Sequence, residues 1–269
     1  MRYVQPLREG GSLPAVVGTN GGGLFVAKFR GAGQGVKSLI AEVIVGLLAR
    51  AAGLPTPDLA LIDVPPSFGR SEPDPEIQDL LRASHGTNIG MRYLDGAFNF
   101  DPLAAGDLIT PELAARIVWF DAFVTNPDRT HRNTNLLIWN RQPWLIDHGA
   151  ALYAQHDWPS VDDLRTRTPF PFIRDHVLLR RSGDLEQADT ALTRALGGDI
   201  IRDAVAAVPD ALLDDPAILR DFTTIDAARD RYVAYLEGRL RAQHLFLAES
   251  VGARDRVLND APQRMAARR

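Results

Sequence analysis

The residues best suited to chemistry lie between Trp119 and Tyr153, in two polar clusters separated by short apolar runs. The first cluster comprises Asp128, Arg129, His131, Arg132, Asn133 and Asn135. The second comprises Asp147, His148 and Gly149. Phosphoryl transfer needs a carboxylate to accept the hydroxyl proton, an amide oxygen on Mg²⁺ and a cation on the moving phosphoryl group. Acid and histidine side chains can also hold Zn²⁺ or Mn²⁺, so a kinase and a metal hydrolase both fit these clusters.

Two residues far upstream favour a nucleotide. Lys28 lies inside an apolar run, where a lysine that extends to solvent is the ordinary alternative. Glu42 falls in a segment that is apolar nearly all round a helix, and such a helix is usually buried. A buried carboxylate needs a partner, and Lys28 is available on the preceding strand. The pair would hold an ammonium group beside nucleotide phosphates; the alternative is that Glu42 pairs with an arginine for structure alone.

A glycine-rich corner, Gly10-Gly11-Ser12, precedes the Lys28 strand. Consecutive backbone N–H groups in such a corner can bind phosphate oxygens. The corner matches neither of the common glycine-rich nucleotide motifs. By itself it is typical of an ordinary turn, and only its position before Lys28 favours a phosphate-binding role.

The elements that must position these residues change character near residue 94. Before it, the pattern predicts strands at 13–18, 24–29, 59–64 and 89–94 and one helix at 37–52, which Gly53 and Pro55 terminate. The polar segment 65–88 is predicted to be a loop. This strand-rich part, residues 1–94, is the first predicted domain.

The second predicted domain, residues 95–260, is mainly helical. A helix starts after Thr110, whose side chain is a good N-cap and precedes a proline. A hairpin of two short strands, 136–139 and 144–146, then links the two polar clusters. Further helices are predicted at 172–181, 184–196, 199–207 and 225–251, and residues 261–269 are predicted to form a flexible tail.

Bulk composition narrows the class of protein. The chain has 269 residues and no cysteine, so thiol chemistry is excluded. Its net charge of −4 argues against broad binding to nucleic acid or to anionic membranes. No apolar run approaches the length of a membrane span, and the first residues lack the apolar core of a signal peptide. We therefore expect a soluble, cytoplasmic protein with neither nucleic acid nor membrane as a partner.

Three segments resemble the HipA-like kinases, a branch of the protein-kinase-like superfamily with similarity to phosphatidylinositol kinases. They are AVVG with GGGLFVAKFRG, then AEVIVGLLARAAGLPTPDLALID, then NPDRTHRNTNLLIWNRQPWLIDHGAALY. The resemblance covers about residues 3–153 and extends more loosely to 248. It implies an α+β, bilobal fold with a small strand-rich N-lobe, a larger helical C-lobe, and ATP between the two.

The resemblance also implies roles for single residues. Lys28 would contact the nucleotide phosphates with Glu42 as its partner, and Met91 to Leu94, including Tyr93, would form the hinge that binds adenine. Asp128 would be the catalytic base and Arg132 the basic residue of its loop. Asp147 would bind Mg²⁺ together with Asn133, or with Asn135, which directly precedes the strand as the metal asparagine does in ordinary protein kinases. His131 departs by one position from the histidine of the HipA loop.

The expected activity is transfer of the γ-phosphate of Mg-ATP to a serine or threonine hydroxyl of an unidentified protein. A pseudokinase that binds nucleotide without transfer shares every binding residue, and a small-molecule or lipid hydroxyl could also be the acceptor. A metal hydrolase built on Asp128, His131, Asp147 and His148 leaves the Lys28–Glu42 pair unexplained. The oligomeric state is not indicated by the sequence.

Overall fold

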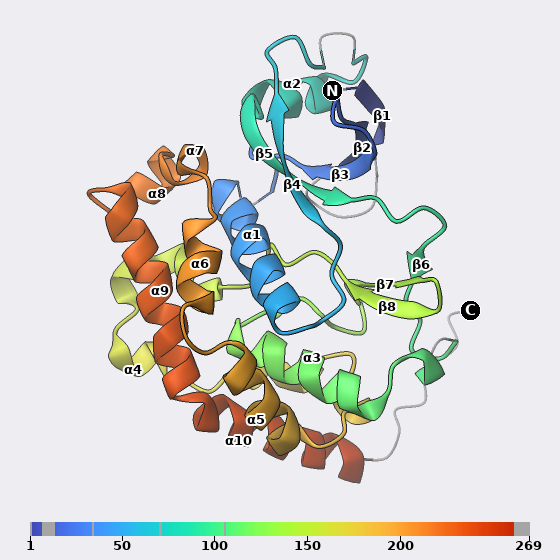
Figure 1. Cartoon of the computed structure of the whole chain (residues 1–269), viewed down its shortest axis with the longest axis vertical. Coiled ribbons are helices and arrows are strands. Elements are labelled where there is room, and N and C mark those ends of the chain that lie inside the picture. The colour runs from blue at the N-terminus through green and yellow to red at the C-terminus, as the bar shows by residue number, and fades with distance from the viewer. Residues whose placement is uncertain (1, 7–13, 34, 70–71, 105, 261–269) are drawn as a thin grey trace.

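The structure of the chain is a computed structural model that describes residues 2–6, 14–33, 35–69, 72–104 and 106–260. A small antiparallel sheet lies at one end and a larger group of helices at the other (Figure 1). The predicted phosphate-binding corner, Gly10, Gly11 and Ser12, lies outside the described residues, and so does the predicted tail 261–269.

The sheet has five strands in the order β1-β2-β3-β5-β4. Their bounds are Arg2–Pro6 (β1), Ala15–Gly18 (β2), Leu24–Lys28 (β3), Leu59–Val64 (β4) and Gly86–Arg92 (β5). Gly22 and Gly23, with φ of 87° and 85°, turn the chain from β2 into β3 in a conformation that glycine adopts without strain. Lys28 is the last residue of β3, the middle strand of the sheet, and lies directly opposite Ile89 on β5.

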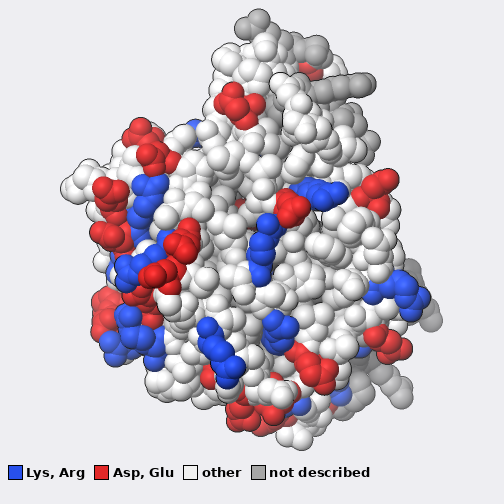
Figure 2. Space-filling model, viewed as in Figure 1, with Lys and Arg blue, Asp and Glu red and all other residues white. Residues whose placement is uncertain are grey.

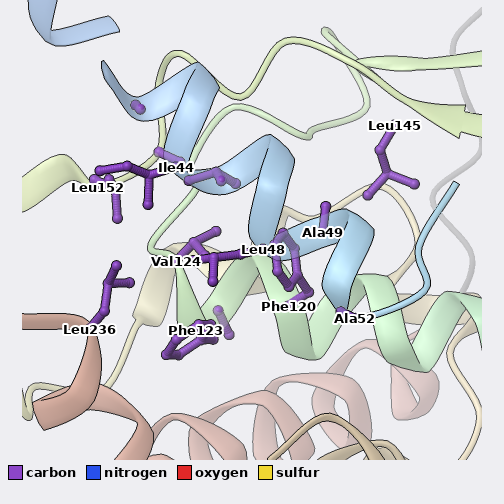
Figure 3. Packing of buried hydrophobic residues seen from close by; sticks show 14 of the residues in the cluster. Ile44, Leu48, Ala49, Ala52, Phe120, Phe123, Val124, Leu145, Leu152 and Leu236 are labelled. Atoms are coloured by element: carbon purple, nitrogen blue, oxygen red, sulfur yellow. The ribbon is translucent and has the colours of Figure 1, made fainter. Parts of the chain in front are cut away.

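Helix α1 (Val36–Ala51) is buried along almost its whole circumference, as its sequence predicts. It ends at Gly53, whose φ of 64° allows the N–H of Leu54 to reach the carbonyl of Ala49. Figure 3 shows Leu48 lying close to Phe120 of the neighbouring helix α3 (Pro111–Phe123) and to Val124, which directly follows that helix. The helix that carries Glu42 therefore packs into the same core as the C-terminal helices.

Lys37, at the start of α1, and Arg30, which precedes the helix, attach this segment to the helical part. The Lys37 ammonium donates to the carbonyl of Gln155 at 2.6 Å and lies 3.4 Å from Asp221. Arg30, which follows β3, pairs with Asp215 at 2.5 Å. Asp215 is also the N-cap of helix α8 (Pro216–Leu219).

The prediction of a loop over 65–88 is wrong, because a helix, α2, occupies Pro75–Ala83 and β5 begins at Gly86. The Asp74 side chain caps α2 by accepting from the N–H groups of Glu76 and Ile77, and Pro75 occupies the first turn. Leu81 is the buried residue of this helix. The prolines and polar residues of the segment suggest a loop, although Ile77, Leu80 and Leu81 recur at helical spacing and pack toward the smaller hydrophobic cluster.

The link between the two parts of the chain runs through a three-stranded sheet, β6-β7-β8. Its strands are Phe98–Asn99 (β6), Leu136–Trp139 (β7) and Gln142–Leu145 (β8). The β7–β8 hairpin is the predicted one, with Leu136 opposite Leu145. Residues 128–135 precede this hairpin and residues 147–149 follow it, so both polar clusters emerge at the same end.

The remaining elements are mostly short helices around α3. They are η1 (Gly106–Leu108), η2 (Tyr153–Ser160), α4 (Asp163–Thr166), η3 (Pro171–Asp175), η4 (Leu179–Arg181), α5 (Leu185–Ala195), α6 (Ile200–Ala206), α7 (Asp210–Leu213), α9 (Ile225–Arg241) and α10 (Gln243–Asn259). The helix predicted at 172–181 is instead two 3₁₀ turns, because His176 is extended between them. The long helix predicted at 225–251 is two helices that meet at Ala242.

Two separate hydrophobic clusters follow from this arrangement. The larger one joins α1 to the helical part, and the smaller one lies between the sheet and α2. Described residues contain no helix long and apolar enough to cross a membrane. On the face in Figure 2, basic and acidic side chains are interspersed, and neither sign forms a continuous region.

Gly90 on β5 offers a test of how closely the sheet packs. A Cβ added there would clash with Ile62 Cδ1 and lie 2.9 Å from Ile62 Cγ1. We expect Gly90→Ala to lower the free energy of unfolding by about 1–3 kcal/mol, measured by urea denaturation. Adding Ile62→Val, which removes the clashing methyl group, should recover part of the loss.

Gly21→Ala is the matched control, because nothing lies within 4 Å of its added Cβ. Equal midpoints for Gly90→Ala and Gly21→Ala would contradict the packing of β5 against Ile62.

Candidate active site

A buried lysine lies between two carboxylates at the centre of the site. Lys28 Nζ is 2.7 Å from Glu42 Oε2 and 2.7 Å from Asp147 Oδ1. The expected contact between Lys28 and Glu42 is therefore present, and Asp147 joins it from 119 residues further along the chain. Glu42 Oε2 also accepts the backbone N–H of His148 at 2.8 Å. Glu42 on α1 thus connects β3, through Lys28, to the turn that follows β8.

The charged groups of this cluster shift one another's pKa values, although burial outweighs the Lys28 ammonium at Glu42 and raises the pKa of that carboxyl. Burial alone would lower the pKa of Lys28, but the carboxylates of Glu42 and Asp147 raise it above its ordinary value. The Lys28 ammonium in turn holds the pKa of Asp147 below its usual range. Lys28 is therefore a permanent cation next to an ionised Asp147, and both are available to a phosphate and its metal.

The turn at Asp147 is built from an unusual backbone conformation. Asp147 has a φ of 56°, a left-handed conformation that aspartate tolerates better than most residues. Gly149, two residues later, allows close packing. A Cβ on Gly149 would lie 3.3 Å from Ser38 Cβ and 3.4 Å from the Ser38 carbonyl oxygen on α1. The absence of a side chain lets this turn press against the helix that carries Glu42.

Asp128 is the focus of the second cluster. Its Oδ2 accepts from Asn133 Nδ2 at 2.8 Å and from Asn135 Nδ2 at 2.9 Å. The Asp128 N–H donates to Asn126 Oδ1 at 3.1 Å. The other carboxylate oxygen, Oδ1, makes no hydrogen bond within the described part of the chain. This arrangement orients the carboxylate and leaves one oxygen for a proton donor.

The candidate metal ligands offer the oxygen atoms that Mg²⁺ prefers. Both asparagines turn the amide nitrogen toward Asp128, so their amide oxygens point elsewhere, without a hydrogen bond to any described residue. The Asp147 side chain is 43% exposed, so its carboxylate is accessible from solvent. One carboxylate and an amide oxygen fit a Mg²⁺ ion that takes its other ligands from water and nucleotide phosphates.

The other predicted site residues are less closely connected. Met91 is opposite Val26 on β3, two residues from the Lys28–Ile89 pair, so it shares the face of the sheet with Lys28. The N–H of Tyr93 is bonded to the carbonyl of Leu24 at 2.9 Å. Arg132 is exposed, and no described ion pair or side-chain hydrogen bond holds its guanidinium.

Four buried residues support the site, and none of them was assigned a role in it from the sequence, although Arg129 lies in the first polar cluster. Asp121, Asn126, Arg129 and His176 form one hydrogen-bonded group beside the Asp128 loop. A carboxylate inside the apolar helix α3 is a signal of the same kind as Glu42 in α1, and it could have pointed to Asp121. Arg129 and His176 are brought to Asp121 by the loops that carry them.

His148 makes no contribution through its ring. Both ring nitrogens are buried without a partner, and burial lowers the pKa of His148 to about 3. Among the described residues, no group of three or more His, Asp or Glu side chains is arranged to hold a metal ion. The acid–histidine cluster required by the hydrolase hypothesis is not assembled by these residues.

Comparisons with known proteins agree with this arrangement. Residues 2–163 match the HipA-like kinase family. The structure is similar to the crystal structure of the Helicobacter pylori proinflammatory kinase CtkA, with a TM-score of 0.52 and 11% sequence identity over 93% of this chain and 97% of that chain. At this identity the likeness shows a shared fold. A search of curated proteins gives no match.

The buried His148 predicts a pH dependence of stability. Between about pH 6.5 and pH 3, unfolded His148 binds a proton and folded His148 does not, so stability falls as pH falls through this window. At pH 5 the loss is about 2 kcal/mol. We expect His148→Leu to reduce the dependence of the urea midpoint on pH between 7 and 5.

His176, whose pKa burial also lowers, acts in the same direction, so some pH dependence should persist in this variant. The exposed His131 provides the control, and His131→Leu should keep the wild-type slope. An unchanged slope in His148→Leu would show that this imidazole is not buried in its neutral form.

Proposed function

Because this chain belongs to the family of HipA-like kinases, we propose that it transfers the γ-phosphate of Mg-ATP to a serine or threonine hydroxyl of a protein. The observation that carries the proposal is the Lys28 ammonium held between Glu42 and Asp147 at 2.7 Å from each. Glu42 is the buried partner of the Lys28 cation, which can bind a phosphate. The neighbouring Asp147 can bind the metal ion that accompanies the phosphate.

In this proposal, the N-terminal part of the chain binds the nucleotide. Lys28 contacts the phosphates, while Glu42 keeps its ammonium in place. Backbone N–H groups of Gly10, Gly11 and Ser12 would add to the phosphate contacts. Met91 and Tyr93 would line the adenine position, since Met91 lies on the same sheet face as Lys28.

Mg²⁺ is assigned to Asp147 and one asparagine of the Asp128 loop. The ion would neutralise charge on the phosphates, which is the chief need of phosphoryl transfer. Asp147 now shares its Oδ1 with Lys28. Binding of Mg-ATP would give each of these two residues a new partner, with Glu42 retaining the lysine.

Asp128 is proposed as the base that accepts the proton of the acceptor hydroxyl. The two amide donors on Oδ2 orient the carboxylate, and Oδ1 faces no described donor. A base within hydrogen-bond reach of the hydroxyl is what proton transfer requires. Arg132, which is exposed on the same loop, would supply a cation to the transferred phosphoryl group.

Asp128→Asn tests this assignment. We expect the substitution to lower kcat for phosphoryl transfer by roughly 10²–10⁴-fold, since general-base catalysis contributes that much. The affinity for Mg-ATP should stay close to that of the wild type, because nucleotide contacts are made by other residues. Transfer is measured from γ-labelled ATP to a degenerate Ser/Thr peptide library and to the enzyme itself, and affinity by calorimetry.

The exposed Asp175, which pairs loosely with Arg174, provides the control substitution Asp175→Asn. A wild-type rate in Asp128→Asn would remove Asp128 from its role. A wild type that binds Mg-ATP and transfers to no peptide, lipid or small alcohol would instead be a nucleotide-binding module.

Asn133 is our assignment for the metal amide, and a pair of variants separates it from Asn135. Asn133→Ala should raise the Mg²⁺ concentration for half-maximal transfer by about 10-fold. Asn135 has a φ of 45°, so Asn135→Gly removes its amide without straining the backbone. This second variant should change the Mg²⁺ requirement less; the opposite order would assign the metal to Asn135.

A further inference from the structure

One fully buried carboxylate gathers the supports of the candidate active site. Asp121, on α3, is completely excluded from solvent. Its Oδ2 lies 2.6 Å from Arg129 Nε and 2.9 Å from His176 Nε2, and its Oδ1 accepts from Asn126 Nδ2 at 3.1 Å. The Arg129 guanidinium keeps the pKa of Asp121 below its ordinary range despite the burial, which alone would raise it. Asp121 is therefore an anion with three donors.

The histidine in this group is neutral, and its tautomer follows from its contacts. His176 Nδ1 accepts the backbone N–H of Leu178 at 3.0 Å, so the ring proton is on Nε2. That proton is donated to Asp121. Burial lowers the pKa of His176, which favours the neutral ring. The formal charge of the group is thus one anion, Asp121, and one cation, Arg129.

Arg129 extends this group to both polar clusters of the site. Its Nη1 donates to the carbonyl of Asn135, through a short contact, and to the carbonyl of Ile146 at 3.4 Å. Asn135 is one candidate metal amide, and Ile146 directly precedes Asp147. The Ile146 N–H donates to the same Asn135 carbonyl at 3.1 Å. A single guanidinium thereby fixes the backbone at the two ends of the β7–β8 hairpin relative to each other.

Asn126 provides the second connection, to the proposed base. It donates to Asp121 and accepts the N–H of Asp128. Arg129 is also the residue directly after Asp128. Both links from Asp121 therefore end on the backbone of, or next to, the residues that must be placed together for phosphoryl transfer, namely Asp128, Asn135 and Asp147.

We propose that Asp121 and Arg129 are positioning residues for phosphoryl transfer, which hold the Asp128 loop and the Asp147 turn in one relative arrangement. The inference rests on the proposed function. A buried ion pair is a weak source of stability compared with apolar packing, so stability alone does not account for it. Its ends lie on the backbone beside the proposed base and metal ligands, where small displacements are costly to rate.

Arg129→Lys tests the inference, since lysine keeps the charge and loses the planar fork that reaches Asp121 with one edge and the two carbonyls with Nη1. We expect kcat to fall by about 10–100-fold, with KM for ATP changed much less, and the Mg²⁺ concentration for half-maximal transfer to rise. A readout independent of turnover is the thermal shift with a non-hydrolysable ATP analogue. The extra shift that Mg²⁺ adds over EDTA should shrink, and the shift in EDTA should persist.

Arg239→Lys is the matched control, because Arg239 is equally buried and donates to the carbonyls of Ala122, Phe123, Thr166 and Thr168, none of which lies in the Asp128 loop or the Asp147 turn. It should lower the melting temperature without changing the Mg²⁺ requirement. Asn126→Ala is the second variant, for use if Arg129→Lys does not fold. It keeps the ion pair and loses the link to Asp128, so we expect a smaller fall in kcat than for Arg129→Lys.

Three results bear on the inference. Losses of kcat and of the Mg²⁺-dependent shift in Arg129→Lys, beyond those in Arg239→Lys, support it. Equal behaviour of the two lysine variants, with Asn126→Ala also active, overturns it and leaves Asp121 with a structural role alone. A wild type without transfer and without any Mg²⁺-dependent shift would instead contradict the proposed function.

Discussion

The contact between Lys28 and Glu42 is the interaction on which the arrangement of this protein depends. A carboxylate can be excluded from solvent on α1 only because an ammonium group reaches it from β3. That requirement fixes the helix against the sheet on one side. The N–H of His148 donates to the same Glu42 oxygen, so the Asp147 turn is held at the same place. Residues separated by more than a hundred positions are thereby brought to one ammonium group.

A second buried carboxylate repeats this device in the helical part. Asp121 on α3 holds the Asp128 loop through Arg129 and Asn126, as Glu42 on α1 holds the Asp147 turn. In both cases a rigid helix supplies an anion, and the irregular backbone that carries the candidate reacting groups supplies the donors. Left-handed residues at Asn135 and Asp147 are tolerated because these donors and acceptors over-determine the loops.

Much of this architecture was predictable from local patterns, and the exceptions have physical causes. The apolar periodicity of α1 and the short apolar run of β4 predicted those elements to within a residue or two, because burial dominates their sequences. Helix α2 was missed because the prolines and polar residues around it outweighed its short apolar face of Ile77, Leu80 and Leu81. The predicted helix at 172–181 fails at His176, whose contacts with Asp121 and Leu178 hold it extended. The pairing of Asp121 with Arg129 depends on the loop between them, and no local pattern encodes that.

The way α1 is anchored has a mechanical consequence. Its aliphatic side chains belong to the larger hydrophobic cluster, and Lys37 and Arg30 fasten its beginning to Gln155, Asp221 and Asp215. Swinging this helix outward to part Lys28 from Glu42 would expose that cluster to water and break these contacts. The Lys28–Glu42 ion pair is therefore held in place by the packing of α1 as well as by its own charges.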